Sequence, residues 1–306
     1  MMSTHRIVSL IASATEIVTA LGFEDQLVGR SHECDFPPSI EWLPVCSSSK
    51  VEVGASSRAI DDQVTSIVAD GLSVYHVDST LLDRLAPTLI VTQTQCQVCA
   101  VSLADVERAV CELVSSRPKI VSLEPMSLAD IWRDIRAVAA ALGNPDRGVR
   151  LVAELTARLE AIRERTASLP TRPSIACVEW IDPPMNAGNW MPELVEIAGG
   201  THLFGDPGQH SGYFSMEELA AADPNVIAIM PCGFDIDRAR CEMPALRARP
   251  EWPQLSAVKH SRVFLTDGNQ YFNRPGPRVV ESAEILAELL HPEHFDFGHR
   301  GTGWTQ

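Results

Sequence analysis

The chain has 306 residues, 45% of them hydrophobic and 21% charged, which is enough for two globular domains with a core in each. Its formal net charge is −15, whereas a nucleic-acid partner requires a basic surface, so we expect no nucleic acid as a partner. No apolar run approaches the roughly 20 residues of a membrane-spanning helix, so we expect no membrane insertion.

The chain begins with a predicted strand, Arg6–Leu10, followed by a helix over Ser13–Leu21. Ser13 with Glu16 three residues later predicts a capping box at the start of this helix, and Gly22 ends it. We interpret this segment as structure and not as a secretory leader. The eight cysteines are then expected to be thiols, and the expected compartment is the cytoplasm.

Strands and helices alternate through the first half of the chain, where short apolar runs bounded by polar loops predict strands of a parallel sheet. The predicted strands are Gln26–Arg30, Ser73–Val77, Thr88–Val91 and Ile120–Leu123, and the predicted helices are Ala59–Ala69, Leu81–Leu85 and one that begins at Ser102.

Two long helices follow, over Ser127–Leu142 and Arg147–Ser168. The second has an apolar stripe at three- and four-residue spacing and would extend over roughly 30 Å, about the width of a small domain. The residues of the stripe are Leu151, Leu155, Leu159 and Ile162. We therefore predict a rigid connector between two halves.

The second half repeats the alternation of strands and helices. Strands are predicted at Ser174–Trp180, Asn225–Met230 and Arg262–Leu265. Helices are predicted at Pro192–Ala198, at Met216–Ala221, in a charged stretch that ends at Arg249, and at Pro275–Leu290. Ser215 is the predicted cap of the helix Met216–Ala221. The predicted organisation is an α/β lobe over 1–126, a helical connector over 127–169, a second α/β lobe over 170–292 and a tail over 293–306.

The unusual residues of the chain all follow predicted strands. They are His32, Cys34, Cys96, Cys99, Trp180, Asp182, Trp190, Cys232, Phe234, Asn269, Tyr271, Phe272 and Arg274. If the sheets are parallel, the loops that contain them lie at the carboxyl ends of the strands, where open α/β sheets bind ligands.

The pair Cys96-x-x-Cys99 has the spacing to place two sulfur atoms on one ion, and Cys34, His32 or Cys232 could complete a zinc or iron–sulfur set. A single cysteine or histidine could instead be the axial ligand of a corrin cobalt or a haem iron. Two other interpretations stay open: a redox pair with a lowered thiol pKa, and small buried residues that shape a tight loop.

Five aromatic residues suit a wide apolar cleft for a planar macrocycle, although a role in the second-lobe core is the alternative. They are Trp180, Trp190, Phe234, Tyr271 and Phe272. Arg274 could pair with a carboxylate or phosphate of the ligand, or it could be a solvated loop arginine.

Several motifs resemble the class III periplasmic-type substrate-binding proteins, which bind vitamin B12, iron chelates or metal ions. The resemblance covers residues 6–291 and rests on IVSLIASATEIVTALG, SMEELAAADPNVIAIM and NQYFNRPGPRVVESAEILAELLHP. SHECDFPP, TQCQVCAVS and RPGPRVVES are similar to a cobalamin-binding-like subgroup without a signal peptide. The resemblance implies two Rossmann-like lobes with parallel sheets, joined by one long bridging helix, and a ligand in the cleft between them.

In exported B12-binding members of this family, one acidic residue of each lobe docks onto arginines of an ABC permease. The resemblance places Glu217 in the position of the second-lobe acid. The first lobe offers only Asp105 or Glu107, because its loop is rebuilt around Cys96–Ser102, so we do not expect a permease as a partner.

The sequence thus predicts a cytoplasmic binding protein for a corrinoid or a similar metal chelate, a small-molecule partner. We find no nucleophile elbow, P-loop, GxGxxG or HExxH signature and expect no enzyme activity. The alternative is a metalloprotein or redox enzyme that uses a cysteine cluster holding zinc or iron, formed by Cys34, Cys96, Cys99 and Cys232.

Overall fold

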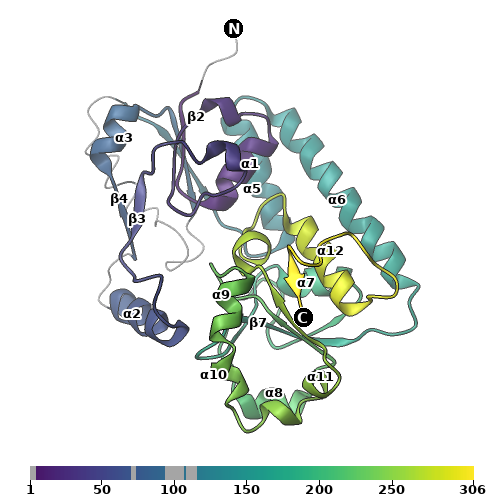
Figure 1. Ribbon diagram of the computed structural model, residues 1–306. Helices are drawn as coiled ribbons and strands as arrows, with labels where there is room; N and C mark the ends of the chain where they lie inside the picture. Colours follow the sequence, from purple (N-terminus) through teal and green to yellow (C-terminus); the bar gives the residue numbers. More distant parts are fainter. Residues whose placement is uncertain (1–4, 70–73, 94–106, 108–115) are drawn as a thin grey trace. The chain divides into compact units, whose positions relative to one another are not determined.

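The computed structural model describes residues 5–69, 74–93, 107 and 116–306. The chain divides into two compact units (Figure 1). The first comprises Met1–Ala55, Ala59–Pro125 and Ala129–Glu154, and the second comprises Ser56–Arg58, Met126–Leu128 and Leu155–Gln306. The boundary between the units falls within helix α6 (Pro145–Ala167), so the two units share this helix.

The first unit is built on a parallel sheet, as the sequence predicted, but the sheet has four strands, because the predicted strand at Ser73–Val77 lies in a separate antiparallel ribbon. The four strands are β1 (Ile7–Ser9), β2 (Leu27–Arg30), β5 (Leu89–Gln93) and β6 (Lys119–Leu123). They are arranged in the order β2-β1-β5-β6, with every neighbouring pair parallel. A parallel sheet is covered on both faces, which explains why β1 and β5 are buried along their whole lengths.

Among its described residues, the first unit also contains four helices, two 3-10 turns and an antiparallel ribbon. They are α1 (Ala12–Ala20), η1 (Glu24–Gln26), η2 (Pro38–Ile40), β3 (Ser47–Ser49), α2 (Ser57–Ala69), β4 (Tyr75–Val77), α3 (Ser79–Leu85) and α5 (Leu128–Ala141). β3 pairs with β4. The sequence did not predict β3, whose three serines have little tendency to form strands.

The predicted capping box of the first helix is wrong. Helix α1 has Ile11 at its N-cap, and no side chain caps it. Ser13 and Glu16 lie buried inside the helix. The helix starts directly after β1 within the core, so its first turn faces protein and not the solvent that a polar cap usually meets.

Helix α6 has the predicted buried stripe, shifted slightly around the helix. Leu155, Leu159 and Ile162 are buried as predicted, together with Val152, whereas Leu151 is only partly buried. The 23 residues of α6 begin at Pro145. Proline suits the first turn of a helix, because the backbone N–H that it lacks would have no acceptor within the helix at this position.

The second unit contains a six-stranded mixed sheet. Its strands are β7 (Ser174–Trp180), β8 (Met185–Asn186), β9 (Thr201–Leu203), β10 (Val226–Ile229), β11 (Val263–Thr266) and β12 (Trp304–Thr305). The order is β12-β11-β10-β7, and both β8 and β9 pair with β7. Strands β9, β7, β10 and β11 are parallel, and β8 and β12 pair antiparallel with their neighbours.

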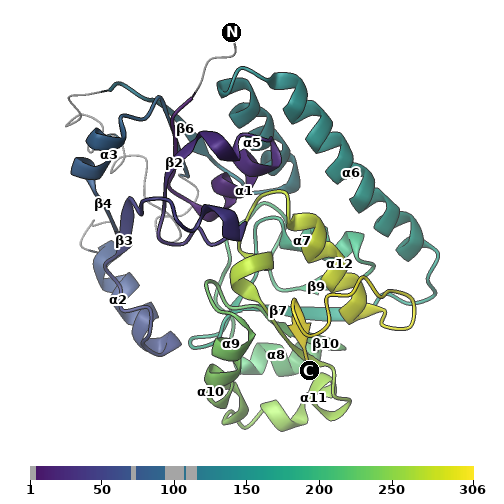
Figure 2. The same cartoon turned by 45° about the horizontal axis from the view of Figure 1, so that its top comes forward.

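Helices cover both faces of this sheet (Figure 2). They are α7 (Met191–Ile197), α8 (Met216–Ala222), α9 (Ile236–Glu242), α10 (Pro244–Arg247), η3 (Trp252–Gln254), α11 (Ser256–Lys259), the π-helical turn η4 (Gly268–Phe272) and α12 (Val279–Leu290). Ser215 caps α8 as predicted and forms a capping box with Glu218.

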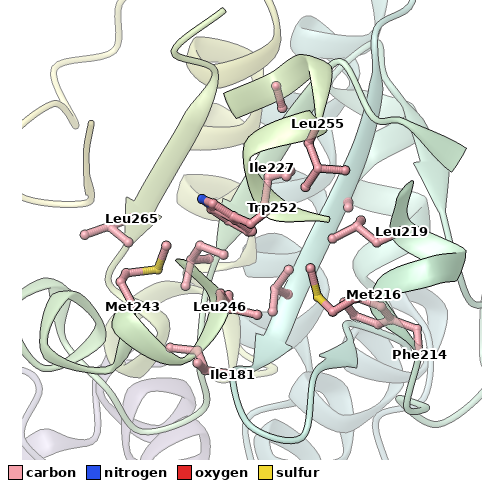
Figure 3. Close-up of a cluster of buried hydrophobic side chains, with 14 residues drawn as sticks. Ile181, Phe214, Met216, Leu219, Ile227, Met243, Leu246, Trp252, Leu255 and Leu265 are labelled. Carbon is pink, nitrogen blue, oxygen red and sulfur yellow. The ribbon is translucent and has the colours of Figure 1, made fainter. Parts of the chain in front are cut away.

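One apolar cluster fixes α8, α10 and α11 against the sheet. Trp252 lies within it, surrounded by side chains from these helices and from the strands (Figure 3). Ile227 and Leu265 contribute from β10 and β11, and Leu219 and Leu246 from α8 and α10. The cluster thereby holds the strands whose carboxyl ends carry the candidate site.

The segment 293–306, predicted as a tail, returns to the sheet. β12 pairs with β11, and Trp304 is buried. The Glu288 carboxylate of α12 accepts hydrogen bonds from Trp304 Nε1 and from the Phe297 backbone N–H, both at 2.5 Å. A buried carboxylate needs such donors, so this segment completes the second unit.

Candidate functional site

The loops after β10 and β11 are joined to each other and to the end of β7 at the carboxyl end of the second sheet. The Cys232 N–H donates to the Glu179 carbonyl over 3.1 Å, which joins the β10 loop to β7. The Asn269 N–H donates to the Phe234 carbonyl over 3.0 Å, which joins the β11 loop to the β10 loop. Backbone hydrogen bonds therefore set the positions of the side chains that these loops carry.

The β10 and β11 loops also make one very close approach at Gly268. A Cβ atom at this position would lie 2.2 Å from the Pro231 carbonyl oxygen and 2.7 Å from the Met230 carbonyl. Asn273 reinforces the contact, because its Nδ2 donates to the carbonyls of Met230 (3.2 Å) and Gly268 (2.9 Å). Only glycine fits this approach.

Most of the predicted aromatic residues are buried in the second unit. The rings of Trp180 and Phe234 pack at 5.2 Å between centroids, and the Arg238 guanidinium lies 4.9 Å from the Phe234 centroid. Trp190 and Phe272 are 5% and 2% exposed. These four residues are buried, and direct contact of any of them with a ligand stays a prediction.

Tyr271 is the predicted aromatic residue that remains half-buried on the η4 turn. The Arg278 guanidinium lies 4.4 Å from its ring centroid, which orients the ring by a cation–π contact. Burial raises the pKa of the Tyr271 phenol, so it stays neutral at physiological pH and can donate a hydrogen bond.

Arg274 is buried, so its interpretation as a solvated loop arginine is wrong. Its Nη2 donates to Asn269 Oδ1 over 3.1 Å. Arg278 is also buried and donates from Nε to the Glu281 carboxylate over 3.1 Å. Burial raises the pKa of the Asp267 carboxyl in the same turn, and the charges of Arg274 and Arg278 oppose that rise. The η4 turn thus contacts two buried guanidinium groups, that of Arg274 through Asn269 and that of Arg278 through the Tyr271 ring.

The candidate residues of the first unit lie after β2. His32 Nδ1 is 2.9 Å from the Ser47 hydroxyl oxygen, and its ring packs on Tyr75 at 5.3 Å between centroids. The Tyr75 hydroxyl donates to the Glu33 carboxylate over 3.0 Å. Burial lowers the pKa of His32, so the ring is neutral at physiological pH.

Cys34 is a buried thiol held in a polar network. The Thr15 hydroxyl lies 3.0 Å from its sulfur and donates to Ser9 Oγ over 2.8 Å. Burial raises the pKa of Cys34, whereas a metal or redox thiolate requires a lowered pKa. The physical chemistry of this site favours a packing role.

The cysteine-cluster alternative gains no support from the structure. Cys96 and Cys99 lie outside the described residues. Cys34 and Cys232 belong to different units. In the described part of the chain, no group of three or more histidine, cysteine or acidic side chains could hold a metal ion.

Glu217 is exposed in the first turn of α8, and its role in docking stays a prediction. Asp105 is outside the described residues. Among the helices that can be described, none is long and apolar enough to cross a membrane.

Sequence reasoning missed several residues that shape these surfaces. Arg278 was not selected, although it follows RPGP in the same loop as Arg274. Ser47 and Tyr75 could not be linked to His32, because they lie on β3 and β4, and no local spacing relates these strands to the β2 loop.

A parallel α/β architecture with its distinctive side chains at the carboxyl ends of the strands is that of a ligand-binding protein. The model of the periplasmic binding protein family matches residues 7–270. The chain belongs to this family, as its resemblance predicted.

Individual relatives agree with this assignment. The vitamin B12-binding protein of Vibrio cholerae is 26% identical over 288 residues, which cover 94% of this chain and 89% of that protein. The periplasmic haem-binding protein RhuT of Roseiflexus in its apo form is 23% identical with a TM-score of 0.68, over 95% of this chain and 99% of the other. The periplasmic vitamin B12-binding protein BtuF of Vibrio cholerae is 21% identical with a TM-score of 0.66, over 94% and 96%. These structural likenesses show the fold.

Proposed function

We propose that this protein binds a corrinoid, or a closely related planar metal chelate, through the loops at the carboxyl ends of its strands. The observation that carries the proposal is the η4 turn, where the half-buried Tyr271 ring lies beside the buried Arg278 guanidinium, and where Asn269 accepts a hydrogen bond from the buried Arg274. The similarity to vitamin B12-binding proteins over nearly the whole chain supports it.

The chemistry of this turn suits such a ligand. A corrin ring offers an apolar face with polar amide groups around its rim. The Tyr271 ring supplies apolar area, worth roughly 25 cal/mol for each Å² removed from water. Asn269 and Gln270 are only partly buried and carry amides that can exchange hydrogen bonds with the rim of the ligand.

Titration of the purified protein with aquocobalamin, dicyanocobinamide and haemin tests the proposal by calorimetry. We expect 1:1 binding of at least one corrinoid. Absence of heat and of spectral change with all three compounds would contradict the proposal, and binding of haemin alone would replace the corrinoid by a haem.

Variants of Tyr271 test whether the η4 turn is the site. Tyr271→Ala removes the apolar face and should weaken corrinoid binding by roughly tenfold or more, whereas Tyr271→Phe keeps the ring and most of the affinity. Tyr213→Ala is the matched control, since Tyr213 is 62% exposed elsewhere in the same unit. Equal affinities of all three variants would exclude Tyr271 from the site.

We further propose that the protein functions in the cytoplasm. The motivation is that the apolar segment Ile7–Ala20 forms β1 and α1 and contributes to the core of the first unit. Fractionation of cells that produce the full chain, followed by immunoblotting, tests this location, and recovery in an extracytoplasmic fraction would contradict it.

A further inference from the structure

A pocket of about 400 Å³ lies at the amino end of the second sheet, and all of its lining residues belong to the second unit. It is bordered by the segments that lead into β7, β10 and β11 and by the end of α12. Because these three strands are parallel, the pocket is at the opposite end of the sheet from the η4 turn, which follows β11. Its basic, acidic and amide side chains are those of Arg172, Asn225, Arg262, His291, Glu293 and His294.

The two arginines are held by backbone carbonyls and keep most of their donors free. Arg262 is half-buried, and its Nη2 donates to the carbonyls of Leu289 over 2.8 Å and of Leu290 over 3.2 Å. Arg172 is exposed, and its Nη2 donates to the Glu196 carbonyl over 3.0 Å. Among the residues that the structure describes, neither arginine forms an ion pair, and the Nε and Nη1 atoms of both form no hydrogen bond. Each guanidinium is thus fixed in place with donors to spare.

His291 and Asn225 add two further polar groups with a fixed orientation. His291 is 5% exposed, and its Nε2 lies 3.1 Å from the Gly199 carbonyl oxygen, so the ring proton is on Nε2. Within the described ranges, Nδ1 of this ring has no hydrogen-bond partner. Asn225 Oδ1 accepts the Ser174 N–H over 2.9 Å, which settles the direction of the amide and leaves Nδ2 as a donor.

Positive charge dominates around this pocket, although the formal net charge of the whole chain is −15. Burial lowers the pKa of His291, and repulsion by His294, Arg262 and Arg172 lowers it further. Burial also lowers the pKa of Arg262, a cost that an anion beside the guanidinium would offset. Among the lining residues only Glu293 is acidic, and it is exposed. The partial negative charge at the end of α12 is offset by Arg262, which binds its last carbonyls.

We propose that this pocket binds a dianionic phosphate group, either as inorganic phosphate or as the phosphate of a small monoester. Such a phosphate carries close to two negative charges at pH 7, which the two guanidinium groups match. Guanidinium N–H groups form strong hydrogen bonds with phosphate oxygens, and the Asn225 amide supplies one more donor. The pocket volume lies within the range of roughly 300–1,000 Å³ for small-molecule sites, so an organic substituent also fits. The inference goes beyond the proposed function and does not depend on it.

Calorimetry of the full-length protein in a phosphate-free buffer tests the proposal, with inorganic phosphate, phenyl phosphate and acetate as probes. We expect 1:1 binding of at least one of the two phosphates, and binding of the singly charged acetate at least tenfold weaker. Tighter binding of phenyl phosphate would identify a monoester as the ligand, and tighter binding of inorganic phosphate would identify the free anion. Absence of heat with both phosphates, or equal affinities for phosphate and acetate, would overturn the inference.

Variants locate the bound phosphate. Arg172→Gln removes an exposed guanidinium and should weaken phosphate binding by roughly tenfold or more, because charge-assisted hydrogen bonds are lost. Arg262→Gln should have a similar effect, with folding checked by circular dichroism. Glu293→Gln removes the acidic group of the pocket and should strengthen binding. Arg163→Gln, a change of an exposed arginine of α6 in the same unit, is the matched control and should leave the affinity unaltered.

The titration of His291 supplies a readout that does not depend on a variant. A bound anion offsets the repulsion from the neighbouring cations, so saturating phosphate should raise the pKa of His291 in NMR spectra. An unchanged pKa of His291, or an Arg172→Gln variant that binds phosphate as tightly as the unmodified protein, would overturn the inference. Corrinoid binding should be the same with and without phosphate, so a failure here is distinct from a failure of the proposed function.

Discussion

The carboxyl ends of the two sheets are built in different ways. In the second unit, backbone hydrogen bonds join the β10 loop to the end of β7 and to the β11 loop, and Gly268 allows the two loops to touch. In the first unit, side-chain contacts hold the candidate residues themselves, with His32 held by Ser47 and Cys34 by Thr15. The second unit thus fixes its loops through the backbone, and the first orients an imidazole through a side-chain contact.

The largest effect should follow from breaking the loop contact of the second unit. Gly268→Ala places a Cβ against backbone atoms that cannot move aside, and overpacking of this kind costs about 3 kcal/mol. We expect the thermal midpoint, measured by circular dichroism, to fall by about 6–10 °C.

Gly54→Ala is the matched control in the first unit. A Cβ there meets no atom within 4 Å, so the thermal midpoint should change little. An equal fall in both variants would show that the loop contact has no special role.

The next effect tests whether the rigidity of the second unit depends on its final segment. Glu288→Ala leaves the Trp304 indole and the Phe297 N–H without their acceptor, at a cost of about 2 kcal/mol. Limited proteolysis should then cleave within 293–306 faster than in the unmodified protein. Glu293→Ala changes an exposed residue and should leave cleavage unaltered, and equal rates for Glu288→Ala would refute the anchoring role.

The first unit should show its own pH dependence through Asp134. Burial raises the pKa of this carboxyl to about 6, above its usual 3.8, despite a hydrogen bond from the Glu124 N–H. The folded state binds the proton of Asp134 more tightly than the unfolded state. The contribution of this carboxyl to the free energy of unfolding is therefore complete below pH 4 and is lost as the pH rises through 6.

Asp134→Asn should remove that loss. Relative to the unmodified protein, the variant should gain on the order of 1 kcal/mol in free energy of unfolding between pH 4 and pH 7. Urea unfolding at both pH values measures the gain, and a difference that is independent of pH would contradict the assignment.

The smallest effect is expected in the second unit, in a higher pH window. The hydrogen bond to Glu284 over 3.0 Å raises the pKa of His299 above 6.5, so its stabilisation is complete below that pH and is lost as the pH rises through the raised value. His299→Gln should cost less than about 1 kcal/mol at pH 6 and still less at pH 9. If the stability cost of His299→Gln grew as the pH rose, the result would contradict a stabilising pair between His299 and Glu284.

The main elements of the fold follow from local patterns in the sequence. Strands β1, β5, β7, β10 and β11 are short apolar runs, and α6 has an unbroken stripe, so each is specified by its own residues. Strands β3, β8 and β12 could not be predicted, because two or three residues without apolar alternation become strands only through the partner they meet.

The candidate site was predictable in position but not in detail. The order of strands and loops indicated that His32, Phe234 and Tyr271 follow strands of parallel sheets. Which side chains are buried depends on tertiary packing, so the sequence did not separate Tyr271 from Phe272 or reveal that Arg274 is enclosed.

Native mass spectrometry of the purified protein with equimolar aquocobalamin, dicyanocobinamide and haemin tests the central claim most directly. We predict a single 1:1 complex with a corrinoid, which Tyr271→Ala weakens and Tyr213→Ala leaves unchanged. A spectrum that contains only the free protein, or only a haem complex, would contradict the proposal that this protein binds corrinoids.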